Sequence, residues 1–217
     1  MPDRQIMQRD AGGILVRKPD PDAMEACLSE FGLLPGQDIW IFGYGSLMWN
    51  PGFPHLEARP ALLRGYHRKF CVYSFRYRGT PERPGLVLGL DRGGSCRGIA
   101  FRVAAADAAG VIEYLWGREM INGVYRPKRL PVRTEPSIVE ACTFVAERRH
   151  GQYCGNLDLP GMAECIRRGY GERGPNQEYL SNTVQHLREL GIHDESLERL
   201  LVEVASEGRP QGETLEA

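Results

Sequence analysis

The chain has 217 residues, a formal net charge of −1, and a composition that is 42% hydrophobic and 25% charged. These values are typical of a soluble globular protein, and the near-neutral charge gives no reason to expect nucleic acid or an anionic membrane as a partner. No apolar run approaches the roughly 18 residues of a membrane-spanning helix. The polar N-terminus also lacks the apolar region of a secretory signal, so we expect a cytoplasmic protein.

The cysteines and histidines show no spacing that would hold a metal ion or a redox couple. Six cysteines are present, and the closest pair, Cys154 and Cys165, stands eleven residues apart, so there is no C-x-x-C motif. The five histidines form no H-E-x-x-H or similar ligand pattern. We therefore expect no metal and no disulfide framework. Cys71 and Cys142, in apolar strand-like runs, are predicted to be buried thiols.

Residues 1–37 are predicted to form an N-terminal extension, residues 38–206 the folded domain, and residues 207–217 a C-terminal tail. The extension contains one predicted helix at residues 21–31, which Asp20 would cap. A segment packed on the surface and a partly ordered tail both fit this extension.

A predicted strand leads directly into a predicted binding turn near the start of the domain. Ile-Trp-Ile-Phe at 39–42 is an unbroken apolar run, typical of a short strand buried on both faces. Gly43 and Gly45 then break the strand, because glycine tolerates positive φ and lets a ligand approach bare backbone. Tyr44 and Ser46 add hydroxyls to a turn whose N–H groups can point outward together and hold an anion. A tight turn that binds nothing is the alternative.

Three named motifs fail at this turn. The dinucleotide fingerprint G-x-G-x-x-G needs a glycine where Met48 stands, and the phosphate loop needs a Gly-Lys pair that does not follow. The nucleophile elbow G-x-S-x-G needs glycines where Tyr44 and Met48 stand. A serine hydrolase with Ser46 as nucleophile and a histidine as base therefore lacks its usual local frame, and it stays only as a competing hypothesis.

Beyond the turn the pattern predicts several strands separated by tight turns. Pro51 and Pro54 first predict a loop, since proline disrupts regular structure. Strands are then predicted at residues 62–75, with a basic interruption at 67–69, and at 86–90, 99–103, 129–133 and 138–145, with a turn at 91–94. The basic, proline- and glycine-rich loop at residues 76–85 is either solvated charge or a lid that meets a substrate anion.

One predicted helix carries a carboxylate on its apolar face. Its stripe recurs at i, i+3, i+4 and i+7 through Ala108, Val111, Ile112 and Leu115. Four residues further on the same face stands Glu119, whereas Glu113 falls on the polar face. A carboxylate on an apolar stripe is costly unless it is paired or lines a cavity. Glu119 is therefore a candidate functional residue. The alternative is a helix-end glutamate that pairs with a nearby arginine or reaches water.

The last third of the chain is predicted to be helical. One apolar stripe runs through Leu180, Val184 and Leu187, and another runs through Leu197, Leu200, Leu201 and Val204. Gly191 is predicted to end the first helix as its C′ residue, and Asp194 to begin the second as its N-cap. Strands followed by helices indicate an α+β domain, which we predict to be a small mixed β-sheet curled into a barrel with surrounding helices.

Four sequence blocks, taken in order, resemble one family. The first two are Trp-Ile-Phe-Gly-Tyr-Gly-Ser-Leu-Met-Trp-Asn-Pro at 40–51 and Gly-Ile-Ala-Phe-Arg at 98–102. The third is Leu-Trp-Gly-Arg-Glu-Met at 115–120, followed by Gly123 and Tyr125, and the fourth is Gly-Pro-Asn-Gln-Glu-Tyr-Leu at 174–180. Together, over about residues 38–203, they resemble the ChaC family of glutathione-specific γ-glutamylcyclotransferases, which have a curled mixed sheet.

The resemblance implies a cofactor-independent enzyme with glutathione as its substrate. In this family the α-amine of the γ-glutamyl group attacks its own γ-carbonyl, which releases 5-oxoproline and cysteinylglycine. Glu119 matches the family's catalytic position and would be the base. The residues expected to bind substrate are Ile41, Phe42, Gly43, Tyr44, Gly45, Ser46, Leu47 and Tyr125. Further candidates are Tyr179 for a pocket wall, and Arg76 or Arg78 for the glycine carboxylate of glutathione.

Two departures from the family pattern concern detail. Gly117 weakens the helix just before Glu119 by about 1 kcal/mol relative to alanine. Asn122 with Gly123 replaces a double-glycine turn.

Besides the serine hydrolase, a binding module that keeps the fold without chemistry is a competing interpretation. Glu119 argues against it, because a sensor needs no base on an apolar stripe. The sequence leaves the oligomeric state and the strictness of glutathione specificity open.

Overall fold

The computed structural model describes residues 7–9, 15–17, 29, 31–32, 36–120 and 123–206 of the chain. Most of the helix predicted at residues 21–31 and all of the tail predicted at residues 207–217 lie outside the described residues. Near the N-terminus, two short strands, β1 (Met7–Arg9) and β2 (Leu15–Arg17), pair antiparallel as a sheet of their own.

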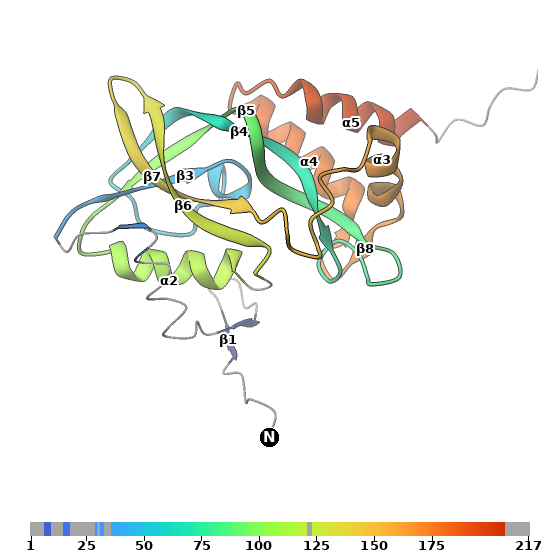
Figure 1. Cartoon of the computed structure of the whole chain (residues 1–217), viewed down its shortest axis with the longest axis horizontal. Helices are drawn as coiled ribbons and strands as arrows, with labels where there is room; N and C mark the ends of the chain where they lie inside the picture. Colours follow the sequence, from blue (N-terminus) through green and yellow to red (C-terminus); the bar gives the residue numbers. More distant parts are fainter. Residues whose placement is uncertain are drawn as a thin grey trace, which may run out of the picture. The chain divides into compact units, whose positions relative to one another are not determined.

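Five strands close into a barrel (Figure 1). They are β3 (Ile39–Gly43), β4 (Glu57–Ser74), β5 (Gly85–Val103), β6 (Tyr125–Thr134) and β7 (Ile138–Ala146). Around the barrel they follow the order β3-β5-β4-β6-β7. Because β3 pairs antiparallel with β5 but parallel with β7, the sheet is mixed. The prediction of a small mixed sheet curled into a barrel is confirmed.

The remaining elements are mostly helical. They are the 3₁₀-helix η1 (Ser46–Met48), the α-helices α2 (Ala108–Glu119), α3 (Leu159–Arg168), α4 (Asn176–Glu189) and α5 (Glu195–Ser206), and the hairpin strands β8 (Tyr170–Gly171) and β9 (Gly174–Pro175). The predicted helix ends are confirmed for α4 and α5. Gly191 follows α4 with a φ of 68°, and the Asp194 carboxylate accepts a hydrogen bond from the Leu197 N–H at 3.2 Å.

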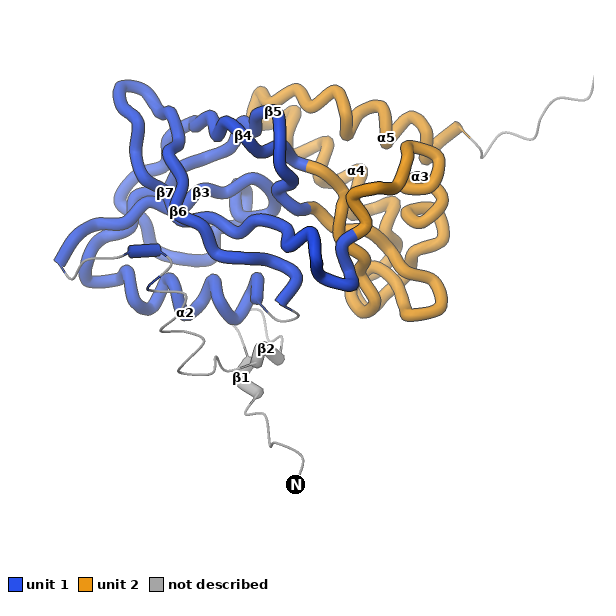
Figure 2. The backbone as a smooth tube through the Cα atoms, viewed as in Figure 1, with its two compact units in different colours: residues 1–68, 89–153 blue, residues 69–88, 154–217 orange. Residues whose placement is uncertain are grey.

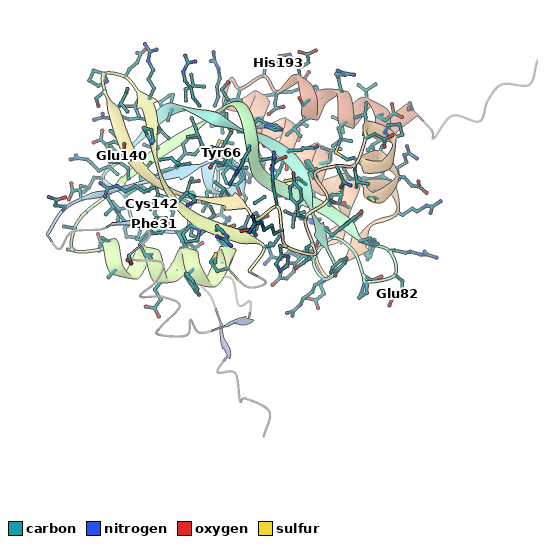
Figure 3. All side chains as sticks on the ribbon, in the orientation of Figure 1. Phe31, Tyr66, Glu82, Glu140, Cys142 and His193 are labelled. Atoms are coloured by element: carbon teal, nitrogen blue, oxygen red, sulfur yellow. The ribbon has the colours of Figure 1, made fainter. Side chains whose placement is uncertain are left out.

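The chain divides into two compact units, shown in Figure 2. The first comprises residues 1–68 and 89–153, and the second comprises residues 69–88 and 154–217, so β4 and β5 each contribute to both. The first unit buries an apolar core built from β3, η1, β5, α2 and β7, which includes Phe31 and Cys142, both labelled in Figure 3. In the second unit, the predicted stripes of α4 and α5 supply buried side chains.

The strands predicted at residues 86–90 and 99–103 are a single strand. Residues 91–94, predicted as a turn, lie inside β5, with φ values of 102° at Gly93 and 67° at Gly94. The two glycines therefore distort the strand locally, as in a bulge, without reversing the chain. The side-chain contacts of Asp91 hold this part of β5 in place. Its side chain is buried and accepts hydrogen bonds from Arg148 at 2.7 Å and from the Tyr153 hydroxyl at 2.9 Å.

Helix α3 is missing from the expectations, although its start carries a readable signal. Asp158 caps it by accepting a hydrogen bond from the Gly161 N–H at 2.9 Å, and Pro160 lies in its first turn. Such an Asp-x-Pro start is typical of a helix N-terminus. Only Ala163 and Ile166 of this helix are buried, so its apolar stripe is too short to predict a helix by periodicity.

A buried amide fixes the start of α4 in the second unit. The side chain of Asn176 is fully buried, and it pairs with both backbone groups of Leu86. Its Oδ1 accepts from the Leu86 N–H at 2.6 Å, and its Nδ2 donates to the Leu86 carbonyl at 2.8 Å. One side chain thus replaces the pairing that the first residues of β5 would otherwise need.

Replacing Asn176 with alanine is expected to lower the free energy of unfolding by about 2–4 kcal/mol, because two buried backbone groups of Leu86 lose their partner. Urea denaturation followed by circular dichroism measures this change. Asn182→Ala is the matched control, since Asn182 is exposed on the same helix and should change stability by less than about 0.5 kcal/mol. Equal urea midpoints for the two variants would contradict this role for Asn176.

Candidate active site

The predicted binding turn follows β3 and continues into η1. Neither Gly43 nor Gly45 has a positive φ, so the expectation that these glycines supply left-handed backbone is wrong. Close packing explains Gly43 instead. A Cβ atom there would lie 3.1 Å from the Leu47 Cβ and 3.3 Å from the Phe101 ring. Gly98 of β5 is more severely restricted, because a Cβ atom on it would lie 2.3 Å from the Gly43 carbonyl oxygen.

Side chains from three elements hold the turn. The hydroxyl of Thr143, on β7, donates to the Phe42 carbonyl at 3.0 Å. The buried Arg68, on β4, donates from Nε to the Tyr44 carbonyl at 2.5 Å and from Nη2 to the Arg97 carbonyl at 2.7 Å. Arg118, on α2, reaches the turn as well. These contacts fix the backbone from Phe42 onward against the barrel.

The held carbonyls leave the N–H groups of the turn available. Because a trans peptide directs its C=O and N–H to opposite sides, the bond from Arg68 to the Tyr44 carbonyl turns the Gly45 N–H away from Arg68. Within the described chain, the N–H groups of Gly45, Ser46 and Leu47 donate to no acceptor. Successive free N–H groups of this kind form a concave site that binds anions.

Glu119 is the last residue of α2, and its side chain is 19% exposed. The stripe that predicted its position is confirmed, since Val111, Ile112 and Leu115 are buried while Glu113 is exposed. Burial raises the pKa of the Glu119 carboxyl, and the positive charge of Arg118 opposes that rise in pKa only in part. The carboxyl group is therefore both enclosed and paired, because Arg118 Nε lies 3.4 Å from its Oε1.

Arg118 joins the turn to the end of α2. Its Nη2 donates to the Ser46 hydroxyl at 2.6 Å, and its Nη1 donates to the Asn50 carbonyl and the Tyr114 hydroxyl, each at 3.0 Å. Glu119 and the Ser46 turn therefore share one guanidinium. Sequence reasoning missed Arg118, although it stands next to Glu119 in the third family block.

The side chains of three other expected substrate-binding residues belong to the apolar interior of the first unit, and a fourth packs against its core. Ile41 and Phe42 are 1% exposed, so their side chains belong to the barrel interior. Leu47 lies in the apolar core, and the partly buried Tyr125 packs against that core. Tyr179 belongs to the second unit, where its ring centroid lies 5.6 Å from that of Phe70.

The basic loop at residues 76–85 is anchored within the second unit. Arg76 pairs with Glu172 at 2.9 Å, and Arg78 donates to the carbonyls of Arg173 and Pro175. Arg78 also lies over the Tyr179 ring, 5.1 Å from its centroid. Both arginines thus have partners within their own unit. These contacts do not decide whether the loop carries solvated charge or acts as a lid that meets a substrate anion.

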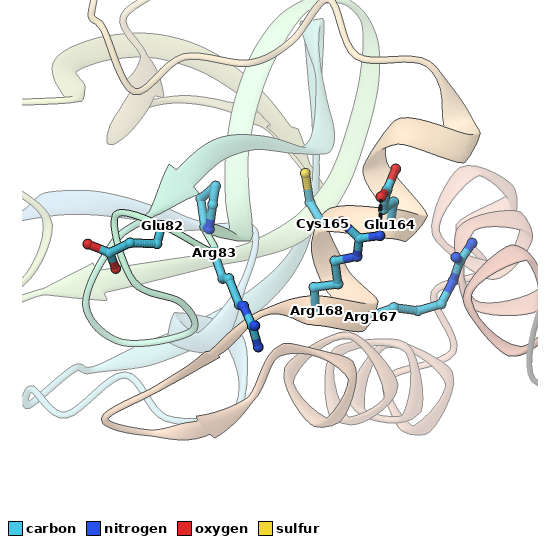
Figure 4. A pocket seen from close by; sticks show the side chains of 7 residues that line it. Glu82, Arg83, Glu164, Cys165, Arg167 and Arg168 are labelled. Atoms are coloured by element: carbon cyan, nitrogen blue, oxygen red, sulfur yellow. Dashed lines mark ion pairs between the residues drawn. The ribbon is translucent and has the colours of Figure 1, made fainter.

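A separate open cavity of about 740 Å³ lies in the second unit (Figure 4). It is lined by Glu82, Arg83, Pro84, Glu164, Cys165, Arg167 and Arg168. None of the residues expected to act on substrate lies in it.

Over the part of the chain that the structure describes, no three His, Cys, Asp or Glu side chains gather as a metal site requires. No described helix has both the length and the apolar character needed to cross a bilayer.

Comparisons with known proteins agree on one family. A family model described as ChaC-like protein matches residues 39–207. The glutathione-specific gamma-glutamylcyclotransferase of Escherichia coli (strain K12) is 38% identical over 167 residues, which cover 76% of this chain and 72% of that protein. The protein of the same name from Schizosaccharomyces pombe is 36% identical over 202 residues, which cover 82% of this chain and 96% of that protein.

Solved structures show the same fold. The crystal structure of a yeast gamma-glutamylcyclotransferase specific to glutathione superposes with a TM-score of 0.71 at 22% sequence identity. The match covers 80% of this chain and all of that one. The curled barrel is therefore the shared architecture of the two chains.

Proposed function

The chain belongs to the ChaC-like family, and on that basis we propose that it is a glutathione-specific γ-glutamylcyclotransferase. It cleaves glutathione into 5-oxoproline and cysteinylglycine. The names of relatives at 36–38% identity support the substrate. The observation that carries the proposal is the enclosed carboxyl of Glu119, which shares the Arg118 guanidinium with the glycine turn.

The reaction needs a base and no enzyme nucleophile. The α-nitrogen of the substrate forms a bond to its own γ-carbon, and the amide bond to cysteine then breaks. The nitrogen must first lose a proton, since an α-ammonium group has a pKa of about 7.7–8.0. Glu119 accepts that proton and returns one to the departing cysteine nitrogen. The attacking nitrogen loses a second proton once it has bonded to the γ-carbon, and the released amine takes up this proton as its ammonium form. Burial raises the pKa of Glu119 toward that of the amine, which makes the transfer less unfavourable.

The turn binds the anionic parts of the substrate. The N–H groups of Gly45, Ser46 and Leu47 face an α-carboxylate or the oxyanion that develops at the γ-carbon. One preorganised donor to an oxyanion contributes about 2.7–4 kcal/mol. Holding the flexible glutamyl chain in its cyclising conformation contributes more, about 7–11 kcal/mol in well-oriented intramolecular reactions.

The geometry argues against both competing interpretations. In a serine hydrolase the hydroxyl of Ser46 would donate to a base, but its hydrogen-bond partner is Arg118. A guanidinium has no acceptor and cannot take the proton. A binding module without chemistry would have no use for a carboxyl group whose pKa burial raises, as at Glu119.

Glu119→Gln is expected to give a folded protein whose kcat for glutathione falls at least about 10²-fold, because the amide cannot accept a proton at neutral pH. The release of 5-oxoproline measures kcat, and isothermal titration measures glutathione binding, which should persist. In the wild type, kcat should decrease as the pH falls through the raised pKa of Glu119.

Glu113→Gln is the matched control, since Glu113 lies on the exposed face of the same helix. It should turn over glutathione at the wild-type rate. A Glu119→Gln variant within a few-fold of the wild type would show that Glu119 is not the base.

Specificity for the tripeptide predicts a large preference over γ-glutamyl-alanine. Both substrates carry a second carboxylate, but that of glutathione is on its glycine, one residue further from the γ-glutamyl group than the alanine carboxylate. Charge-assisted hydrogen bonds to a correctly placed carboxylate are about twice as strong as neutral ones. We expect kcat/KM for glutathione to exceed that for γ-glutamyl-alanine by at least about tenfold, measured as 5-oxoproline release from each. Equal kcat/KM values would refute the specificity while leaving the cyclisation intact.

A further inference from the structure

We propose that Arg118 is a positioning residue, which presents the Ser46 hydroxyl to the substrate and holds Glu119 beside the turn. The inference rests on the proposed cyclisation, and it assigns a role to a side chain that touches no reacting atom itself.

The guanidinium of Arg118 is fully engaged. A guanidinium carries five N–H donors in a rigid plane and no acceptor. Nη2 donates to Ser46 Oγ at 2.6 Å, Nη1 donates to the carbonyl of Asn50 and to the hydroxyl of Tyr114, and Nε lies 3.4 Å from Glu119 Oε1. All three nitrogens therefore have partners. Two of the four partners, Ser46 and Asn50, belong to the turn and the residues after it, and the other two belong to α2. Such a planar fork fixes relative position in a way that a lysine ammonium does not.

The first consequence concerns the proton of Ser46. A hydroxyl has one donor hydrogen and two acceptor lone pairs. Because Arg118 occupies a lone pair, the hydrogen of Ser46 stays free to donate elsewhere. No other described residue accepts it. An anionic atom of the substrate, either its α-carboxylate or the developing oxyanion, is the acceptor that fits, because the neighbouring N–H groups of the turn face the same kind of ligand.

The second consequence concerns the charge of Glu119. The guanidinium of Arg118 acts on this carboxyl group at close range, since its Nε lies 3.4 Å from Glu119 Oε1. Its positive charge favours the ionised form, which is the form that accepts a proton, whereas burial disfavours that form. Without Arg118 the carboxyl group would hold its proton at higher pH.

These two effects are separated by two substitutions of Arg118. Arg118→Gln removes the charge, so the acid limb of the kcat profile should move to higher pH. Arg118→Lys keeps the charge but not the fork, so the limb should stay near that of the wild type while kcat falls at least about tenfold, less than the 10²–10³-fold typical of one lost oxyanion donor. Both variants are measured as the full chain, with glutathione as substrate and thermal unfolding as the folding check.

A double-mutant cycle tests the link through Ser46. Ser46→Ala should lower kcat and leave the acid limb in place. Arg118→Lys combined with Ser46→Ala should be no slower than the slower single variant, because the two residues act as one unit. Fully additive losses would overturn the proposed presentation of Ser46 by Arg118.

Arg126→Gln is the matched control for the pH profile, since Arg126 is an exposed arginine on β6 that also pairs with a glutamate, Glu147. Its acid limb should match that of the wild type. If the acid limb of Arg118→Gln also matched, the role of Arg118 beside Glu119 would be overturned. If the wild-type protein released no 5-oxoproline from glutathione, the proposed function itself would fail. The wild-type measurement in the double-mutant cycle therefore separates a failure of the proposed function from a failure of the role of Arg118.

Discussion

The site depends on the fixed orientation of one short piece of backbone, from Phe42 to Leu47. Every backbone group directed inward from this piece must find a partner, since an unpaired buried carbonyl costs about 1–3 kcal/mol. Thr143 and Arg68 supply those partners for the carbonyls of Phe42 and Tyr44. The outward N–H groups are then available without any rearrangement. At the Tyr44–Gly45 peptide, the interior contact from Arg68 therefore leaves the Gly45 N–H available on the opposite side.

The closed barrel makes this arrangement possible. Thr143 lies on β7, which is distant from β3 in the sequence, and Arg68 lies on β4, which is the next strand in the chain but is not paired with β3. Closing the sheet brings β7 beside β3 and places β4 one strand further around, beyond β5. A barrel also leaves no exposed edge at β3. The same closure lets β5 approach β3 at Gly98, where a larger residue would collide with the Gly43 carbonyl.

Local patterns predicted the parts of the site that depend on neighbours in sequence. The apolar run predicted β3, and the helical period of α2 placed Glu119 on the buried face. Contacts between distant residues left no such pattern. Arg68 is 24 residues from Tyr44, and Arg118 is 72 residues from Ser46. In the sequence, Arg68 reads as part of a basic interruption in a strand, although it is buried.

The relative sizes of the catalytic effects explain why so much structure surrounds so few reactive groups. General-base assistance of 10²–10⁴-fold corresponds to about 2.7–5.4 kcal/mol, at 1.36 kcal/mol for each factor of ten. Correct positioning of an intramolecular nucleophile can supply about 7–11 kcal/mol. In a cyclisation the substrate brings its own nucleophile, so the larger share falls to the surface that folds the glutamyl chain. Under the proposed mechanism, we therefore expect the contacts that hold the turn rigid, from Arg68, Thr143 and Arg118, to be as important to the rate as the carboxylate of Glu119.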